Sequence, residues 1–207
     1  MIVDLFAGTG SGTAAWEGIE PIYKVELDKS FEADWRDIFT FDAKAFVKQY
    51  GKPVFVWASP PCTTFSVASI GFHWHKGGLP KTEAAKLGIK LLDRTLEVIN
   101  QLQPINGFVI ENPRGMMRKM PQMEKLKRQT VSYCAYGDIR QKPTDIWTNS
   151  QWIGRTMCKR GDVCHQAAPR GSRTGTQGLK GAKERSKIQF QLSEEIRNAV
   201  MNRSFNV

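Results

Sequence analysis

Short apolar runs, each ending at a glycine, a proline or an acidic residue, recur along this chain and restrict it to a small set of folds. Ile2–Phe6 runs into three closely spaced glycines, and Val54–Ala58 runs into two prolines. Between the runs lie stretches with helical spacing of apolar residues, the longest being Glu83–Leu102. Strands that alternate with helices indicate βαβ units around a mostly parallel sheet, whose ligands bind at the carboxyl ends of the strands.

The remaining helices and strands are predicted from the same patterns. We expect a helix over 42–50 and a last amphipathic helix over 193–201, with Ser193 as its N-cap. Further strands are expected over 21–27, 108–110, 131–135 and 145–148. At 207 residues, the chain has room for one α/β domain with a small appendage.

Basic residues are concentrated in the later half of the chain. The sequence has 30 Lys and Arg against 20 Asp and Glu, for a net charge of +10. Residues 1–62 hold nine acids and six bases, whereas 114–128 hold six bases and one acid, and 154–187 hold nine bases and two acids. This excess predicts attraction to polyanions, so we expect one part of the chain to handle a small ligand and another to face nucleic acid. A basic surface that only aids solubility is the alternative.

The N-terminus has neither the basic region nor the apolar stretch of a signal peptide, and no apolar run approaches the length of a membrane-spanning helix. We therefore expect a cytoplasmic or nucleoid-associated protein that is not secreted and has no membrane partner. In that reducing setting the four cysteines need not form disulfides.

Three glycines at alternate positions, Gly8, Gly10 and Gly12, follow the first strand. Glycine lets the backbone turn sharply and approach a ligand closely. The spacing is GxGxG, which is not the full dinucleotide pattern, and no phosphate-loop lysine follows it. The glycines alone therefore predict a ligand loop only weakly.

Two acidic positions strengthen that prediction. Glu26 lies at the end of the second strand, where a carboxylate can bind both hydroxyls of a ribose. Asp37 offers a further acceptor beside the apolar Ile38, which suits the edge and the face of an adenine. An ordinary glycine turn with solvated acids is the alternative.

Two consecutive prolines precede a cysteine just after the run 54–58. Pro60 and Pro61 can continue neither a strand nor a helix, so they keep the backbone rigid and present Cys62 at the carboxyl end of the strand. A lone cysteine is more often a packing residue than a catalyst. A polar loop held by prolines is a poor place to pack one, and Cys62 is therefore a candidate nucleophile.

A second candidate, Glu111, ends the apolar run 108–110 and is followed by Asn112 and Pro113. At the end of a neighbouring parallel strand, its carboxylate is expected to face the same crevice as Cys62.

The segments DLFAGTGSG (4–12), SPPCTTFS (59–66) and ENP (111–113), in this order and near these separations, resemble the cytosine-C5 DNA methyltransferase family. The similarity covers residues 1–150 and, more weakly, the last helix. It implies an α/β, Rossmann-like S-adenosylmethionine-dependent methyltransferase fold, with a mostly parallel sheet and helices on both faces. The implied partner is double-stranded DNA. The predicted cofactor-binding residues are Phe6, Gly8, Thr9, Gly10, Gly12, Glu26, Asp37, Ile38 and Pro60.

The resemblance also implies the chemistry. Cytosine C5 is a poor nucleophile, so the Cys62 thiolate adds to C6, with a reactivity that depends on a pKa lowered by a polar pocket. Glu111 hydrogen-bonds the N3 and N4 edge of the base and stabilises the developing charge. A stacked base cannot react in this way, so the cytosine must be flipped out, and contacts with the phosphate backbone offset that cost. We expect the glycine- and aromatic-rich loop 67–80 to close over the DNA.

The arginine pattern of the family is broken here. After the equivalent of Tyr136 and Gly137, the family usually has a glutamine and alternating arginines, one of which holds O2 of the cytosine. Arg140 is the predicted substitute for that arginine, with Lys142 second.

The larger departure from the family is length. Family members carry a long target-recognition region before the final helix, whereas only residues 151–185 are available here. We expect residues 1–150, completed by a C-terminal helix within 186–207, to form the catalytic and cofactor-binding domain. The short, basic, Gly- and Arg-rich segment 151–185 is expected to contact phosphates with little base readout. Sequence readout is then minimal or supplied by a separate partner.

Cys134, Cys158, Cys164 and His165 are the candidates for a metal site. The spacing C-x5-C-H is not a standard zinc spacing, so unpaired reduced thiols are the favoured interpretation and no metal is expected. A tetrahedral zinc site with these four ligands is the alternative, and it would order a segment that has too few apolar residues to form a core.

Two other functions stay open at this stage. A small basic C5 enzyme with little recognition region can act on a structured RNA. The broken arginine pattern also fits an S-adenosylmethionine-binding nucleic-acid module without turnover. The presence of both Cys62 and Glu111 favours the DNA enzyme over that module.

Overall fold

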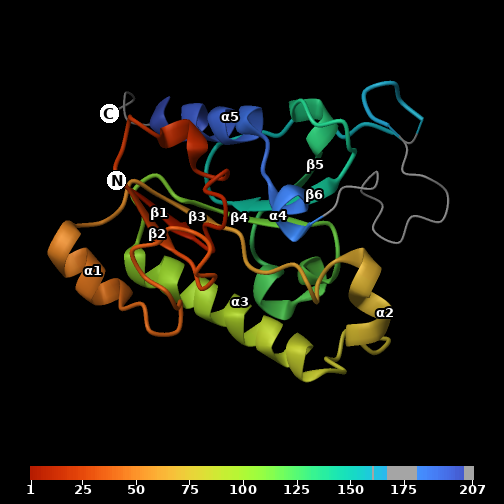
Figure 1. The fold of residues 1–207 in the computed structure, drawn as a ribbon, viewed down its shortest axis with the longest axis horizontal. Coiled ribbons are helices and arrows are strands. Elements are labelled where there is room, and N and C mark those ends of the chain that lie inside the picture. The colour runs from red at the N-terminus through yellow and green to blue at the C-terminus, as the bar shows by residue number, and fades with distance from the viewer. Residues whose placement is uncertain (160, 167–180, 203–207) are drawn as a thin grey trace.

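A six-stranded sheet forms the centre of the computed structural model, which describes residues 1–159, 161–166 and 181–202 (Figure 1). Its strand order is β2-β1-β3-β4-β6-β5. The first four strands in this order are parallel, whereas β6 is antiparallel to both of its neighbours. The strands are β1 (Ile2–Leu5), β2 (Ile22–Val25), β3 (Phe55–Ala58), β4 (Phe108–Pro113), β5 (Arg128–Ser132) and β6 (Pro143–Thr148). The predicted mostly parallel sheet is confirmed.

The register of the parallel strands brings their carboxyl ends to one edge. Leu5 pairs with both Val25 and Ala58, and Ala58 pairs with Ile110. The loops after β1, β2 and β3 therefore start at the same level, and Glu111 stands one residue beyond that level on β4.

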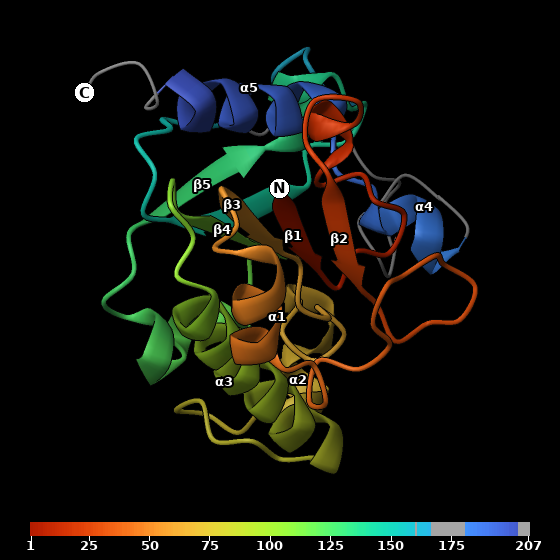
Figure 2. The same cartoon turned by 90° about the vertical axis from the view of Figure 1, so that its left-hand side faces the viewer.

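Helices cover both faces of the sheet, as predicted (Figure 2). One face carries α1 (Ala43–Tyr50) and α3 (Glu83–Leu102), with α2 (Ile70–His73) nearby, and the other face carries α5 (Phe190–Met201). The remaining short helices are η1 (Ala14–Trp16), η2 (Val67–Ser69), η3 (Met116–Lys119), η4 (Pro121–Met123), η5 (Tyr133–Tyr136) and α4 (Ala182–Ser186).

Local signals explain where the two larger helices on the first face begin. The Asp42 carboxylate accepts a hydrogen bond from the Ala45 N–H at the start of α1, at 2.9 Å. The Thr82 hydroxyl does the same for the Ala85 N–H at the start of α3, at 3.2 Å. Such caps satisfy N–H groups that have no partner within the helix. Helix α3 has the bounds predicted from its apolar spacing.

Each face of the sheet has its own core. Val56 and Ile110 pack with Leu92 of α3 on one face, and Phe55 packs with Trp16 and Ile196 on the other. The rings of Trp16 and Phe55 are stacked, with centroids 5.5 Å apart. The long α3 and the C-terminal α5 thus cover opposite faces of the same strands.

Three sequence expectations need correction. The last helix begins at Phe190 with Gln189 as its N-cap, and Ser193 lies inside it, buried. The strand expected over 131–135 instead spans Arg128–Ser132, and Tyr133–Tyr136 forms the short helix η5. Strand β4 continues through Pro113, and Glu111 pairs with Ile146 of β6. Glu111 therefore lies within the strand and not in the loop after it.

Of the Gly- and Arg-rich segment 151–185, residue 160 and residues 167–180 lie outside the described residues. Within those that are described, no helix combines the length and the hydropathy needed to cross a membrane.

Candidate active site

The glycine loop that follows β1 has the backbone conformation that its sequence predicts. Gly8 and Gly10 have φ values of 50° and 73°, and Phe6 adopts φ 60° although it has a side chain. Positive φ is strained for a non-glycine residue and is common at ligand sites. Apart from its chain neighbours, a Cβ at Gly8 would have one atom of the described residues within 4 Å, the Phe6 carbonyl oxygen, so this backbone borders open space.

Gly12 has a different role in the same loop. A Cβ built there would lie 2.5 Å from Nε1 of Trp57, closer than real atoms approach. Gly12 is therefore needed so that the loop can pack on β3.

Glu26 meets the glycine loop directly. The Gly8 N–H donates to Glu26 Oε2 at 2.8 Å, and the Asp28 N–H donates to Oε1 at the same distance. The structure thus brings together the glycine loop and the acid at the end of β2, which sequence reasoning had paired.

Asp37 and Ile38 lie in the loop after β2. The Asp37 carboxylate accepts the Phe39 N–H at 2.9 Å, and Ile38 is buried with its carbonyl held by Arg94 Nε at 3.0 Å. The turn is thus fixed on its protein side.

Helix α5 supports the glycine loop from behind, which the sequence patterns did not indicate. The buried Ser193 hydroxyl donates to the Gly12 carbonyl at 2.7 Å, and the Ile188 N–H donates to Ser11 Oγ at 3.0 Å. The serine predicted as a helix cap is instead a link between the last helix and the first loop.

The proline loop after β3 is joined to both neighbouring strands. The Ser59 N–H donates to the Leu5 carbonyl at 3.0 Å, and Asn112 Nδ2 donates to the Pro60 carbonyl at 2.8 Å. After Cys62 the chain turns, with the Ser66 N–H donating to the Cys62 carbonyl at 2.9 Å. Cys62 is thus fixed above β3, close to the Glu111–Asn112 pair on β4.

The thiol of Cys62 is half-buried, and its electrostatics differ from the expectation. Burial raises the pKa of this thiol, and the nearby Glu111 carboxylate raises it further. The charges of Lys142 and Arg185 lower it, but they do not outweigh burial. The expectation of a lowered pKa is therefore wrong for the protein without its ligands, because the loop removes the thiol from water.

Glu111 is buried and has one firm partner. Tyr133, the first residue of η5, donates its hydroxyl to Glu111 Oε1 at 2.9 Å. Burial raises the pKa of Glu111, while Lys142 and the Tyr133 hydroxyl oppose that effect. The sequence patterns did not single out Tyr133. Its two-residue spacing from Val131 indicates a side chain that points inward, but it does not indicate that the partner is Glu111 on β4, on the other side of β6.

Arg140 and Lys142 both lie near this pair, but in different states. Arg140 is buried, and its Nε and Nη2 are bound to Asp138, while its Nη1 has no partner among the described residues. Nζ of Lys142 lies 4.3 Å from the centroid of the Tyr133 ring, and its charge lowers the pKa of both Cys62 and Glu111. Lys142, predicted second, is thus electrostatically coupled to both candidate catalytic groups.

The four candidate metal ligands also come together. Ligand atoms of Cys134, Cys158, Cys164 and His165 all lie within 4.8 Å of one another, so the cluster has the composition of the zinc alternative. The choice between reduced thiols and a zinc site therefore stays open on this geometry alone.

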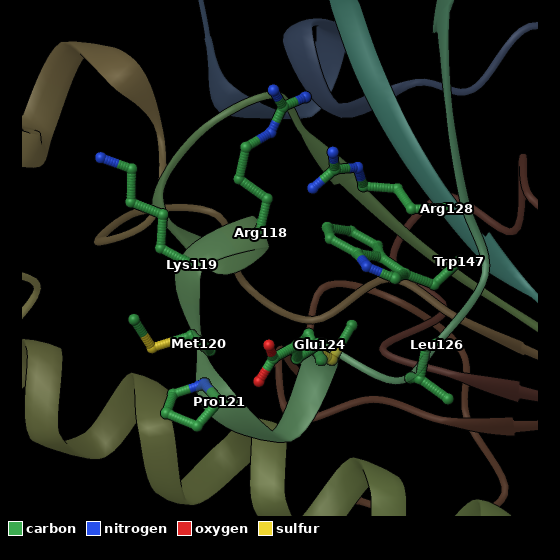
Figure 3. Close-up of a pocket in the computed structure, with 9 residues that line it drawn as sticks. Arg118, Lys119, Met120, Pro121, Glu124, Leu126, Arg128 and Trp147 are labelled. Atoms are coloured by element: carbon green, nitrogen blue, oxygen red, sulfur yellow. The ribbon is translucent and has the colours of Figure 1, made fainter.

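The basic stretch 114–128 starts beside the proline loop. The Met116 N–H donates to the Phe65 carbonyl at 2.6 Å, and Arg114 is exposed next to it. Farther along, Arg118, Lys119 and Arg128 border a cavity of about 640 Å³ around Trp147 (Figure 3). None of the predicted site residues lines this cavity, so it is distinct from the site at the carboxyl edge.

Comparison with known proteins agrees with these motifs. Residues 1–132 match the C-5 cytosine-specific DNA methylase family. A protein of Frog virus 3 (isolate Goorha) named "Probable DNA (cytosine-5)-methyltransferase" is 33% identical over 173 residues, which are 79% of this chain and 77% of the viral one.

Two solved structures share the fold. One is a prophage-encoded E. coli protein described as a DNA modification methyltransferase, with a TM-score of 0.51 and 18% identity. The other is the Entamoeba histolytica methyltransferase EhMeth, with a TM-score of 0.51 and 11% identity. Each match covers 71% of this chain but only 45% and 51% of the respective solved chains, so this chain spans about half of their length. With its family match over 1–132 and its viral relative, the chain belongs to the C-5 cytosine-specific DNA methylase family.

Proposed function

We propose that the protein transfers a methyl group from S-adenosylmethionine to C5 of a cytosine in double-stranded DNA, through a covalent bond between Cys62 and C6 of a flipped-out base. The observation that carries this proposal is the 2.8 Å hydrogen bond from Asn112 Nδ2 to the Pro60 carbonyl. It joins the proline loop to the Glu-Asn pair, so the nucleophile and the acid that must act on one base belong to one rigid unit.

The residues at the carboxyl edge fit the cofactor that the family uses. The backbone at Gly8 borders open space, and Phe6 and Gly10 beside it share its positive φ, which suits close approach of a ligand to this loop. Each oxygen of Glu26 accepts one N–H and keeps a further lone pair for a ribose hydroxyl. We assign Thr9, Asp37, Ile38 and Pro60 to the same site, with Gly12 acting through packing.

The proton on Glu111 is central to the proposed mechanism. Burial raises the pKa of Glu111, so this carboxyl group binds a proton more readily than a solvated one, and in its protonated form it can donate a hydrogen bond to N3 of the cytosine. Loss of its negative charge also removes one of the effects that raise the pKa of Cys62. A protonated Glu111 therefore activates the base and assists formation of the thiolate.

Cys62 Sγ then forms a bond to C6, and the π electrons of the C5–C6 double bond move toward C5. S-adenosylmethionine, when bound, supplies an electrophilic methyl group on a sulfonium sulfur. The bond from C5 to the methyl carbon would form as the carbon–sulfonium bond breaks, leaving a neutral thioether. A base then removes the C5 proton, the C5–C6 double bond forms again, and the Cys62–C6 bond breaks to release the thiolate. Lys142 stabilises that thiolate, and Arg140, with Nη1 free of protein partners among the described residues, is assigned to O2 of the base.

Contacts with DNA follow from the surface beside the proline loop. Arg114 is exposed at the start of the basic stretch and is linked to this loop through Met116, so phosphates can be bound next to Cys62. Phe72, at 68% exposure in the segment 67–80, can fill the gap that a flipped base leaves. Sequence readout is assigned to the basic segment 151–185 or to a separate partner.

The test is Cys62→Ser, with Thr63→Ser, at the exposed neighbouring position, as the matched control. We expect Cys62→Ser to lose at least ~10³-fold in methyl incorporation and to form no adduct with 5-fluorocytosine DNA, while DNA binding stays within about threefold. The control should keep both. Methyl transfer by Cys62→Ser would refute the covalent mechanism, and incorporation into RNA but not DNA would refute the substrate.

A further inference from the structure

Four side chains of metal-ligating type, from separate parts of the sequence, come together beside η5. Cys134 belongs to η5, Cys158 lies in an irregular stretch, and Cys164 and His165 lie in a turn and the bend after it. The sulfur of Cys134 lies 3.2 Å from that of Cys158 and 3.7 Å from that of Cys164. Nδ1 of His165 lies 3.4, 3.5 and 3.9 Å from the sulfurs of Cys164, Cys158 and Cys134.

These distances match the edges of a zinc tetrahedron. With Zn–S of about 2.3 Å and Zn–N of about 2.05 Å, a regular site has S···S edges of about 3.8 Å and S···N edges of about 3.6 Å. Four of the five distances lie within about 0.3 Å of those edges, and only the Cys134–Cys158 edge is shorter, by about 0.6 Å. A single ring nitrogen faces all three sulfurs, as a metal ligand must.

We propose that Cys134, Cys158, Cys164 and His165 form a structural zinc site. Four protein ligands complete the tetrahedron and leave no position for water or substrate, so the ion has a structural and not a catalytic role. The site does not depend on the proposed function, because none of its ligands belongs to the carboxyl edge.

The need for such an ion follows from the rest of the segment, which we call the Cys/His segment (residues 151–159 and 161–166). It contains no helix or strand in these described residues. Trp152 at its start is buried in the core, but the later Val163 is 103% exposed and Ile153 is 83% exposed. Hydrophobic burial therefore holds the start of the segment but not the part that carries Cys158, Cys164 and His165. In segments of this kind, metal binding supplies folding free energy.

The site is placed where it supports the catalytic residues. Cys134 follows Tyr133, which donates to Glu111. Gln141 Nε2 donates to the Cys158 carbonyl at 3.1 Å, and the Gln166 N–H donates to the Ile139 carbonyl at 2.9 Å. The segment thus contacts the loop that carries Arg140 and Lys142 from both sides, and the ion would limit the motion of that loop.

The first experiment uses the untagged full-length protein, expressed with added zinc and purified with a reductant. We expect one zinc ion per chain by elemental mass spectrometry. Replacement of zinc by Co²⁺ should give the visible bands and the sulfur-to-cobalt charge-transfer bands of a tetrahedral thiolate site. The proposal would be overturned if the protein held less than one metal ion per chain even after reconstitution with zinc. A Cys134–Cys158 disulfide, trapped by rapid alkylation, would also overturn it.

The second experiment separates the ligands from other cysteines. Cys158→Ser and His165→Ala should bind zinc roughly tenfold or more weakly. Cys62→Ser, the same substitution outside the cluster, should keep one zinc although it loses methyl transfer. Full zinc retention in both ligand variants would refute the site, whatever the activity shows.

A chelator test on the unmodified protein avoids variants that fail to fold. Removing zinc from the wild-type protein should expose the Cys/His segment to a protease several-fold faster, while cleavage elsewhere is unchanged. Equal cleavage rates with and without zinc would contradict a structural role for the ion.

Discussion

The carboxyl edge of the sheet and the Cys/His segment are held in different ways. At the edge, Glu111 and Asn112 lie on a paired strand, and the loop of Cys62 is fixed by backbone hydrogen bonds and the Asn112 amide. The Cys/His segment has no regular element in its described residues, and we attribute its order to side-chain ligands of a metal. A rigid frame thus holds the reacting groups, whereas a few side chains determine the order of the segment beside them.

Two tyrosines of η5 provide the sharpest test of this difference. Tyr133 donates to Glu111, whereas the hydroxyl of Tyr136 accepts the Arg155 N–H of the Cys/His segment at 2.9 Å. Glu111→Gln should lower kcat by ~10² to 10³-fold because the base loses its proton donor, and Tyr133→Phe by about tenfold. Tyr136→Phe is the control on the same helix and should stay within about threefold. Steady-state methylation rates check this order, and an equal loss in both tyrosine variants would erase the distinction between the two regions.

How far the sequence predicts each region follows the same division. A continuous apolar run predicted β3, which is buried on both faces, and helical spacing of apolar residues predicted α3. The proximity of Gly8 to Glu26 was predictable because parallel strands end at one edge. The contacts of Tyr133 and Ser193 were not, since each depends on a tertiary partner far along the chain.

The clustering of the four candidate metal ligands was not predictable for a related reason. Their spacing matches no standard zinc pattern, because Cys134 comes from η5 and the other three come from a segment more than twenty residues later. A local spacing rule cannot detect ligands that only the fold brings together. The direction of the Cys62 pKa was missed similarly: a polar loop sequence says nothing about how far its thiol is removed from water.

Buried ionisable groups should give the carboxyl edge a pH dependence. Asp4 of β1 is buried, accepts the Thr13 hydroxyl at 2.7 Å, and has its pKa raised by burial to about 7. The folded state therefore binds a proton that the unfolded chain has already released, and this stabilisation is lost as pH rises from about 4 to about 7. Between pH 5 and pH 8 the wild-type protein should lose about 2 to 3 kcal/mol more stability than Asp4→Asn, which has no such proton.

Urea unfolding of both proteins at the two pH values measures that difference. The Cys/His cluster is the same in both proteins, so any pH dependence that it contributes cancels in the comparison. If the stabilities of the two proteins changed with pH in parallel, Asp4 would be ionised at neutral pH, and its burial would not make the folded state less stable as pH rises.

The smallest effect concerns Lys142, which lies between the two regions. Its charge lowers the pKa of Cys62, so Lys142→Met should raise that pKa and leave less thiolate at a given pH. We expect alkylation of Cys62 by iodoacetamide near pH 8 to slow by up to about tenfold, equivalent to one pKa unit. Lys142→Arg should restore most of the rate, and Lys48→Met on α1 should not change it. Mass spectrometry of the Cys62 peptide measures this thiol apart from the cluster cysteines. If zinc removal slows the same alkylation in the wild-type protein, the Cys/His segment positions Lys142. If the rate does not change, the reactivity of Cys62 is determined by the carboxyl edge alone.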